Sequence, residues 1–553
     1  MQSAAQLLNL WDNPVFHRFR RSQLRTRKAI FWYLATLIIT TFVVSITYLS
    51  ETNFAQMPGE LAARTLWMPL LVIQGLIVLF KGTGRTASGL VQDKLDQTLD
   101  YQRLTPVSPL RNVVGYLFGL PILEYTMFAL TLPHLAFVVV KGNIPLGTVF
   151  SVYLVFFVCA IFYHMTAVAV GMVMKRWIWG YLLSIFSVAF LNLILPTLAS
   201  QLGLRFLQYL SIFPVIGQKV APLMNMQQFV PPPPQTSATP FNDDGMTFLS
   251  FGDPVPFFEW TLSPFWFTLL LQSALIVTLA TMAVRRWQKE TKHSLSKPYA
   301  LGILGVFIVL ATGNLWTVIT RESLPFMLFG SRDIDQLSDV LAIGLPMVYT
   351  MAVWLLCIFL YANVVPTHHD YVRGVRRAKK LDRAAARPWD DDSANLPFMM
   401  LFVAFALVGY FVLYGTMSAA GYMSFLEGTG FPQWRLPLVF GLLLVYSFML
   451  LQVLQQRGTV LTVLLVWLLP ILVAIVAAAA IQDLTPLQTV IASLSPLATI
   501  VMSGMLPSEH VSPFNPGSEI AALRIGAWTG MVFLIAQTAF LWWRWRQLRE
   551  KLH

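Results

Sequence analysis

The sequence predicts an all-α fold, a polytopic transmembrane helical bundle of about twelve spans in two six-helix halves. Its 553 residues are 56% hydrophobic and only 12% charged, whereas a soluble domain usually carries about a quarter charged residues. Apolar runs of the length that crosses a bilayer, about 20 residues, recur along the whole chain. The basic residues, which give a net charge of +12, gather in short clusters beside these runs, as in cytoplasmic loops of membrane proteins.

The candidate spans fall into two sets of six. The first six, with their loops, define a half at 29–290, and the second six define a half at 291–553. Residues 1–28 are basic and predict a cytoplasmic interfacial amphipathic helix ahead of the first span. The candidate spans are 29–50, 65–81, 113–139, 147–174, 177–199, 261–284, 299–320, 340–365, 397–418, 436–456, 459–481 and 521–543.

The two halves share a loop pattern, which indicates an internal repeat. Each half has its longest inside loop after its second span and a long outside segment before its sixth span. Each outside segment contains a semi-apolar stretch with a central proline, Pro214 or Pro496, which predicts a short helix that does not span. Parallel six-helix halves would be related by an axis along the membrane normal. The inside loops are 82–112 and 366–396, and the outside segments are 200–260 and 482–520.

The lysine and arginine bias of the loops predicts that both termini are cytoplasmic. Basic clusters occur before the first span, from Arg18 to Lys28, in loop 366–396, and in the C-terminal tail from Arg544 to Lys551. The predicted outside segments are poor in basic residues, and one contains four consecutive prolines, Pro231–Pro234. Such a run favours extended polyproline geometry and predicts a stiff surface loop.

Several function classes find no support in the sequence. The basic residues are not interleaved with aromatic ones as in a nucleic-acid-binding surface, so the expected partner of the basic clusters is the lipid bilayer, with no nucleic acid. Cys159 and Cys357 both fall within apolar runs, and no metal-ligand spacing occurs. No G-x-x-x-x-G-K-[ST], H-E-x-x-H or G-x-S-x-G motif is present. The chain is therefore expected not to be an enzyme, and to hold no cofactor of its own.

The loop after the second span carries the most specific pattern, from Asp93 to Pro109. Three leucines at roughly helical spacing, Leu95, Leu99 and Leu104, predict an amphipathic helix. Thr105-Pro106 and Ser108-Pro109 are predicted to end it, because the residue before a proline is disfavoured in helix. A short helix of this kind in a cytoplasmic loop suits docking into a groove of a soluble partner. The alternative is an interfacial helix that only rests on lipid.

Thr98-Leu99-Asp100 and the later run Leu104-Thr105-Pro106-Val107-Ser108 resemble the first cytoplasmic loop of ATP-binding-cassette (ABC) permeases of the type-2 (ABC-2) exporter family. That family's pattern is approximately acidic-basic-acidic-x-Gly-Thr-Leu-Glu, a short hydrophobic stretch, and then Thr-Pro-Leu-Ser. Asp93 and Lys94 match its first two positions, and Asn13-Pro14-Val15 is similar to the start of the family's interfacial helix.

The chain departs from this pattern at several positions. Gln97 stands in place of the glycine, Leu95 occupies an acidic position, and Asp100 stands where the family has glutamate. The corresponding loop of the second half, 366–396, lacks the pattern and carries a basic cluster instead. Two arrangements therefore remain open. Either one chain supplies the whole translocation path, or two chains pair through their first halves and the second half is an accessory.

The resemblance implies the membrane-spanning permease subunit of an ATP-driven exporter in the plasma membrane, the inner membrane of a bacterium. A separate ABC ATPase subunit would bind the ATP, and the loop helix would couple the two. Leu99, Tyr101 and Leu104 would fill a groove on the ATPase, with Asp93, Asp100 and Arg103 paired at its rim. The residues implied in coupling are Asp93, Thr98, Leu99, Asp100, Tyr101, Arg103, Leu104, Thr105 and Pro106.

Ionisable residues within the candidate spans are scarce, and such residues often mark substrate or ion pathways. Glu124 is the clearest, and His134 and His164 are the others. One interpretation places Glu124 and His164 in a substrate path, and the other has Glu124 satisfied by a neighbouring helix. An alternative function is a secondary transporter of about twelve spans driven by an ion gradient, which would need such buried carboxylates. A membrane-embedded enzyme would need clustered catalytic side chains. The loop pattern favours the exporter, and the sequence does not identify the substrate.

Overall fold

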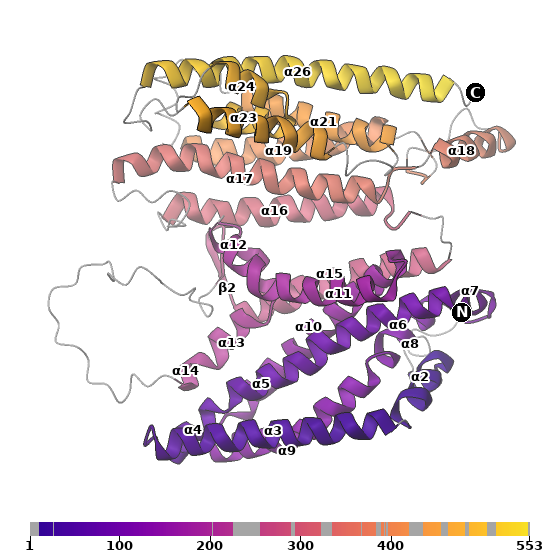
Figure 1. Cartoon of the computed structure of the whole chain (residues 1–553), viewed down its shortest axis with the longest axis vertical. Coiled ribbons are helices and arrows are strands. Elements are labelled where there is room, and N and C mark those ends of the chain that lie inside the picture. The colour runs from indigo at the N-terminus through magenta and orange to yellow at the C-terminus, as the bar shows by residue number, and fades with distance from the viewer. Residues whose placement is uncertain are drawn as a thin grey trace. The chain divides into compact units, whose positions relative to one another are not determined.

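The computed structural model of the chain is a helical bundle, which confirms the all-α prediction (Figure 1). Within the described part, the strands form one antiparallel hairpin, β1 (Val255–Phe257) with β2 (Trp260–Leu262). The structure describes residues 10–25, 27–201, 203–224, 255–288, 293–321, 334–366, 368–382, 389–391, 393, 396–419, 435–454, 463–481, 486–505 and 516–550. The predicted polyproline run Pro231–Pro234, and Arg387 and Lys551 of the basic clusters, lie outside these residues.

Eleven helices in the described residues are long and apolar enough to cross a membrane. They overlap eleven of the twelve candidate spans, although the third candidate, 113–139, begins within α8 (Pro109–Gly119) and its spanning helix begins only at Ile122. The twelfth candidate, 459–481, contains a shorter apolar helix, Leu465–Ala477. The prediction of a polytopic helical bundle is therefore confirmed. The eleven are Arg27–Asn53, Gly59–Leu95, Ile122–Lys141, Leu146–Val173, Trp177–Ala199, Pro264–Gln288, Lys297–Trp316, Gly344–Ala362, Leu396–Ala419, Arg435–Leu454 and Ala522–Leu548.

The chain divides into two compact units, Met1–Lys292 and His293–His553. This division lies two residues beyond the one predicted at 290. Besides the hairpin, the first unit contains helices α2 (Pro14–Leu24), α3 (Arg27–Asn53), α4 (Gly59–Thr65), α5 (Trp67–Gly75), η1 (Leu76–Gly82), α6 (Thr83–Leu95), α7 (Thr98–Leu104), α8 (Pro109–Gly119), α9 (Ile122–Lys141), α10 (Leu146–Val173), α11 (Trp177–Ala189), η2 (Phe190–Ile194), α12 (Leu195–Gln201), η3 (Arg205–Leu210), α13 (Phe213–Lys219), α14 (Ala221–Met224) and α15 (Pro264–Gln288).

In the first unit, α10 lies between α6 and α15, and α6 also packs against α11. A large apolar core is formed mainly by α3, α5, η1, α9 and α10, and it includes Trp67 and Phe156. A smaller core beneath α2, α6, α7 and α8 includes Val15, Leu99 and Trp287. Helices α2, α7 and α8 lie at one end of this unit, and α4 and α14 lie at the other (Figure 1).

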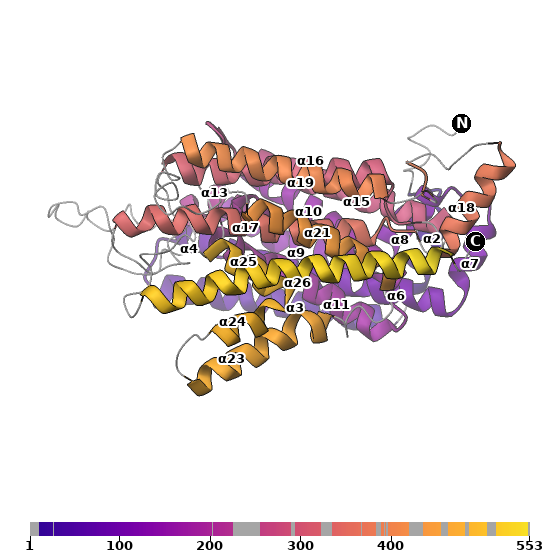
Figure 2. The ribbon, with the colours of Figure 1, turned by 90° about the horizontal axis from the view of Figure 1, so that it is seen from above.

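The second unit contains α16 (Lys297–Arg321), α17 (Ile334–Ala362), α18 (His368–Lys380), α19 (Leu396–Ala419), α21 (Arg435–Leu454), η5 (Val463–Leu468), α23 (Leu469–Ile481), α24 (Pro486–Ser493), α25 (Pro496–Met505) and α26 (Pro516–Glu550). Helix α26 packs against α21, α24 and α25, and α16 packs against α19. Helix α18, in the predicted basic loop, lies at the same end of this unit as the C-terminal end of α26 (Figures 1 and 2).

The predicted second span and the loop that follows it differ from the structure. Residues Gly59–Leu95 form one helix of 37 residues that includes α4, α5, η1 and α6, whereas the sequence predicted a span at 65–81 and a loop at 82–112. The polar composition after residue 81 suggested a loop, but a helix needs apolar residues only where it meets lipid or core. Most of the predicted loop is therefore helical, as α6, α7 and α8.

Short helices precede the last span of each unit, as the proline-centred stretches predicted. Pro214 lies in the first turn of α13, where its missing N–H leaves no helical hydrogen bond unmade. Pro496 is the first residue of α25, which follows α24 in the second unit. These helices have 7, 10 and 8 residues, well below the length that crosses a bilayer.

Candidate functional site

The segment singled out by the sequence, residues 93–109, forms an elbow between α6 and α8, and we refer to it as the elbow. Helix α6 ends at Leu95, and Gln97 adopts the left-handed conformation with φ 57°. This conformation turns the chain into α7. Glycine adopts it without steric cost, so the glycine that the ABC-2 pattern has at this position fits the geometry of the turn.

Helix α7 ends as the sequence predicts at its first proline pair. Thr105 follows the helix in an extended conformation, with ψ 150°, directly before the exposed Pro106. The second pair, Ser108-Pro109, was predicted to end the same helix and instead begins α8. The Ser108 hydroxyl accepts a hydrogen bond from the Arg111 amide at 3.4 Å, and Pro109 occupies the first turn. Serine followed by proline is favourable at a helix start, so the elbow has two separate helical arms.

The three leucines of the predicted amphipathic face do not share one face. Leu99 is 3% exposed and packs in the smaller core of the first unit. Leu104 is 85% exposed and Tyr101 is 71% exposed. Leu95 is exposed too, but it precedes the left-handed turn and belongs to α6. The prediction that Leu99 fills a partner's groove is therefore wrong, because the chain's own core already takes up this side chain.

Polar contacts fasten the elbow to three other elements. The Asp93 carboxylate pairs with Arg18 of α2 and accepts a hydrogen bond from the Tyr116 hydroxyl of α8 at 2.6 Å. Asp93 was predicted at the rim of a partner groove, and its position between α2 and α8 contradicts that role. Arg103 forms an ion pair with Asp100 at 2.8 Å, and its Nη2 donates to the Arg286 carbonyl near the end of α15 at 3.4 Å.

Helix α2 begins where the sequence predicts, at Asn13-Pro14. The Asn13 Oδ1 accepts from the Val15 amide at 3.0 Å, and its Nδ2 donates to the Arg111 carbonyl at 2.6 Å. The apolar face of α2 is buried against α8, and a Cβ on Gly115 of α8 would lie 2.7 Å from the Asn13 Oδ1. The glycine is thus needed for this close approach. Helix α2 is part of the elbow's support.

We expect Asp93→Asn to lower the stability of the first unit measurably. The substitution removes the negative charge that Arg18 pairs with and weakens the hydrogen bond from Tyr116. Hydrogen bonds to charged groups contribute about 1.5–3 kcal/mol each. Asp100→Asn is the matched control, because Asp100 is 66% exposed and exposed ion pairs contribute about 0–1 kcal/mol. Thermal unfolding of the purified chain in detergent measures both, and equal shifts would contradict the structural role of Asp93.

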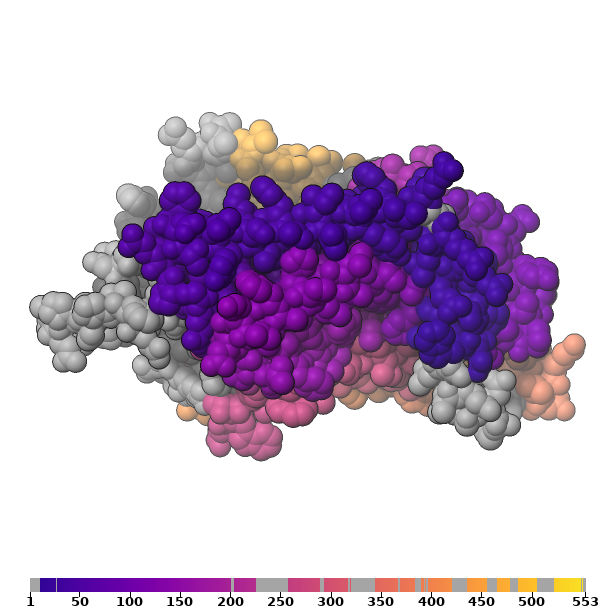
Figure 3. Space-filling model, turned by 90° about the horizontal axis from the view of Figure 1, so that it is seen from below, coloured from indigo at the N-terminus to yellow at the C-terminus, as the bar shows by residue number. Residues whose placement is uncertain are grey.

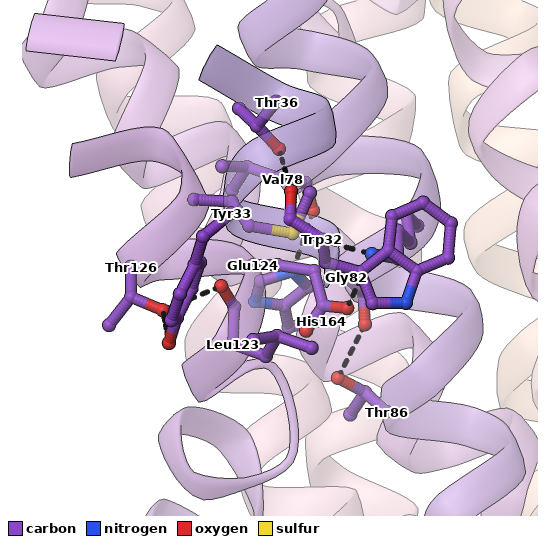
Figure 4. Close-up of polar contacts among 12 residues, drawn as sticks. Trp32, Tyr33, Thr36, Val78, Gly82, Thr86, Leu123, Glu124, Thr126 and His164 are labelled. Atoms are coloured by element: carbon purple, nitrogen blue, oxygen red, sulfur yellow. Dashed lines mark hydrogen bonds and ion pairs between the residues drawn. The ribbon is translucent and has the colours of Figure 1, made fainter. Parts of the chain in front are cut away.

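A second group of polar side chains lies within the spans of the first unit, around the π-helical segment η1. Wide helical turns of this kind are rare in proteins, and those that occur are often found at functional sites. The side chains of Trp32, Glu124 and His164 come together beside Gly82 of η1 (Figure 4). A Cβ on Gly82 would lie 2.8 Å from the His164 Nε2, so the absence of a side chain there makes room for the imidazole.

His164 is fully buried and satisfied by two hydrogen bonds. Its Nε2 lies 3.0 Å from the Val78 carbonyl of η1, and its Nδ1 lies 2.8 Å from the Tyr125 hydroxyl. A carbonyl oxygen only accepts, so Nε2 carries a hydrogen and donates, and a neutral ring accepts at Nδ1 from Tyr125. These contacts give His164 a role in joining η1 to α9 and α10.

Glu124 is fully buried and its nearest cation is Lys81. The Lys81 Nζ lies 3.6 Å from the Glu124 Oε1, 3.3 Å from the Met127 sulfur and 3.6 Å from the centre of the Trp32 ring. Among the described residues, neither carboxylate oxygen has a hydrogen-bond partner. The sequence singled out Glu124 and His164, whereas Lys81 was only the last residue of the predicted second span, 65–81. Lys81 and Arg85 are four residues apart, and this spacing could have predicted that the two cations share one face of a helix.

Comparisons with protein-family models, with curated proteins and with solved structures found no match to this chain. The apolar helices alone define the class: the chain is a multi-pass α-helical membrane protein. The resemblance of the elbow to ABC-2 permeases stays a prediction.

Proposed function

We propose that this chain is the permease subunit of an ATP-driven exporter in the plasma membrane, coupled to a separate ABC ATPase subunit through α7. The observation that carries the proposal is the two-sided character of α7. Tyr101 and Leu104 are exposed beyond the end of the spans, while Leu99, on the same short helix, is buried in the unit's core. An exposed aromatic and an exposed leucine, held on one short helix, suit the groove of a partner protein.

The contacts of the elbow support force transmission to the spans. Through Arg103, α7 contacts the end of α15, and through Asp93 the end of α6 is tied to α2 and α8. Displacement of α7 by a partner would therefore displace α6 and α15, both of which belong to helices long enough to span. The family resemblance supports a nucleotide-driven partner and the export direction. The ATP would be bound by the ATPase subunit, with both termini of the permease in the cytoplasm.

The proposal is tested by co-expressing the chain with its genetic neighbours and isolating it in detergent. An ATPase is expected to co-purify with the wild type and to be lost from Tyr101→Asp and from Leu104→Asp. A hot-spot side chain contributes about 2 kcal/mol or more, which is ~30-fold in Kd. Tyr101→Phe and Leu104→Met are matched controls that keep the apolar surface and should retain the ATPase.

One observation favours the alternative of a transporter driven by an ion gradient. Glu124 is a fully buried carboxylate without hydrogen bonds among the described residues, and buried carboxylates commonly take part in ion coupling. If no ATPase binds, and the purified chain in liposomes transports in response to a proton or sodium gradient, the exporter proposal fails. Loss of that transport in Glu124→Gln would then identify the coupling residue.

A further inference from the structure

Two basic side chains lie one helical turn apart where η1 passes into α6. Lys81 and Arg85 both interact electrostatically with Glu124. Within the described residues, the Arg85 guanidinium has no hydrogen bond or ion pair of its own. Among the described residues, Glu124 is the carboxylate that the two cations share. The cluster has an excess of one positive charge, which favours an anion.

The hydrogen-bonding capacity of this cluster is largely unused. At 3.6 Å, the contact between Lys81 and Glu124 is an ion pair without a hydrogen bond, and both Glu124 oxygens lack a partner in the described part of the chain. An ammonium group has three donors and a carboxylate about four acceptor positions, and the contact of Lys81 with the Met127 sulfur is weak. A ligand with anionic oxygens would accept from Lys81 and Arg85, and its hydroxyl groups would donate to Glu124.

The cluster is partly exposed on the side of Lys81 and Trp32. The Lys81 side chain is 23% exposed, and its ammonium lies on the ring of Trp32 in α3, which is itself partly exposed. The same helix exposes Phe31, Leu34 and further large apolar side chains, and α3 runs as an indigo ridge along the face seen in Figure 3. An apolar chain could lie on this ridge while a polar head reaches Lys81.

We propose that Lys81 and Arg85 bind the anionic head group, a phosphate or carboxylate, of an amphiphilic substrate, with Glu124 as the counterion that holds Lys81 when the site is free. Basic sites between spanning helices are suited to anionic lipid head groups. This inference rests on the proposed transport function, since it names the substrate class of that transporter. It predicts that substrate enters from the bilayer, between α3 and η1, and not from water.

The test uses the purified full-length chain in detergent and two fluorescent lipids with the same label and acyl chains, phosphatidic acid and phosphatidylcholine. Phosphatidic acid is expected to bind at least about tenfold more tightly. Arg85→Gln should weaken its binding about tenfold, since it removes a charge-assisted hydrogen bond. Arg21→Gln, at an exposed position of α2, is the matched control and should bind as the wild type does.

A second variant covers the case in which Arg85→Gln does not fold. Lys81→Met combined with Glu124→Gln removes both charges of the ion pair and should lower the affinity for phosphatidic acid by a similar factor. Equal binding of the two lipids by the wild type, or unchanged binding by both variants, overturns the site. Displacement of phosphatidic acid by an excess of inorganic phosphate would show that the site binds free anions, and it would overturn the proposal that its ligand is an amphiphile.

The outcome is separable from that of the ATPase experiment. Lipid binding is measured on the chain alone, so it succeeds or fails whether or not an ATPase associates with α7. Binding of phosphatidic acid without any ATPase would keep the head-group site and reject ATP-driven export. An ATPase bound at α7, with no preference for the anionic lipid, would keep the exporter and reject an anionic amphiphile as its substrate.

Discussion

Leu99→Asp is expected to prevent stable folding of the elbow, whereas Leu104→Asp, on the same short helix, should leave the fold intact. Leu99 is 3% exposed and packs against residues of α2, α6 and α8, while Leu104 is 85% exposed. Placing an unpaired carboxylate in an apolar core costs several kcal/mol, a large part of the roughly 5–15 kcal/mol that stabilises a typical folded protein. A carboxylate at an exposed position changes stability by no more than about 0.5 kcal/mol.

The two variants are compared by detergent gel filtration and by thermal unfolding. Leu99→Asp is expected to give low yield, aggregation or a markedly lower Tm, and Leu99→Met, which keeps the apolar volume, is its control. A Leu99→Asp chain as stable as Leu104→Asp would mean that α7 is detached from the core, and the proposed force transmission from α7 to the spans would then lose its support. The comparison also decides which variants are usable for partner binding. Only Tyr101 and Leu104 separate loss of docking from loss of fold.

The spans could be predicted from the sequence because the bilayer imposes a simple requirement. A segment that crosses hydrocarbon needs about 20 apolar residues, and eleven described helices coincide with such runs. The same criterion fails at the ends of helices that leave the membrane. Helix α6 is polar enough to suggest a loop, yet it continues the second span and packs against α10 and α11.

The elbow shows what local patterns do and do not determine. The proline after Thr105 ended α7 as predicted, because that restriction acts on the neighbouring residue. Burial of Leu99 was not predictable, since the core that contains it also contains Val15, Leu90 and Tyr116, which come from other helices. Spacing of apolar residues shows that a helix has an apolar face, but it does not show whether the chain or a partner covers that face.

Only part of the cluster around Glu124 could be predicted from the sequence, for the same reason. The carboxylate itself was singled out because it lies inside an apolar run. Its cation, Lys81, lies far earlier in the chain, and the two meet only because η1 and α9 pack together. Likewise, nothing in the local sequence pairs His164 with the Val78 carbonyl.

Removing one partner of the Lys81–Glu124 pair should be far more damaging than removing both. Lys81→Met leaves the buried Glu124 carboxylate without its nearest cation, and breaking a buried ion pair in this way costs about 3–5 kcal/mol. Glu124→Gln leaves the Lys81 ammonium beside Arg85, but Lys81 is partly exposed, so a smaller loss is expected. The double variant removes both charges, and replacing a buried pair by neutral groups is often close to neutral.

A double-mutant cycle on stability measures this coupling, with the free energy of unfolding obtained in mixed detergent micelles. The double variant should be more stable than Lys81→Met alone, because the neutral amide introduced by Glu124→Gln no longer requires a cation. A positive coupling energy of about 1–3 kcal/mol is in the range found for contacting residues. Additive effects would show that the two side chains act independently and that Glu124 does not need Lys81 as its counterion. In that case the carboxylate would be free to hold a proton or ion, which is the state a gradient-driven transporter needs and which an anion site does not.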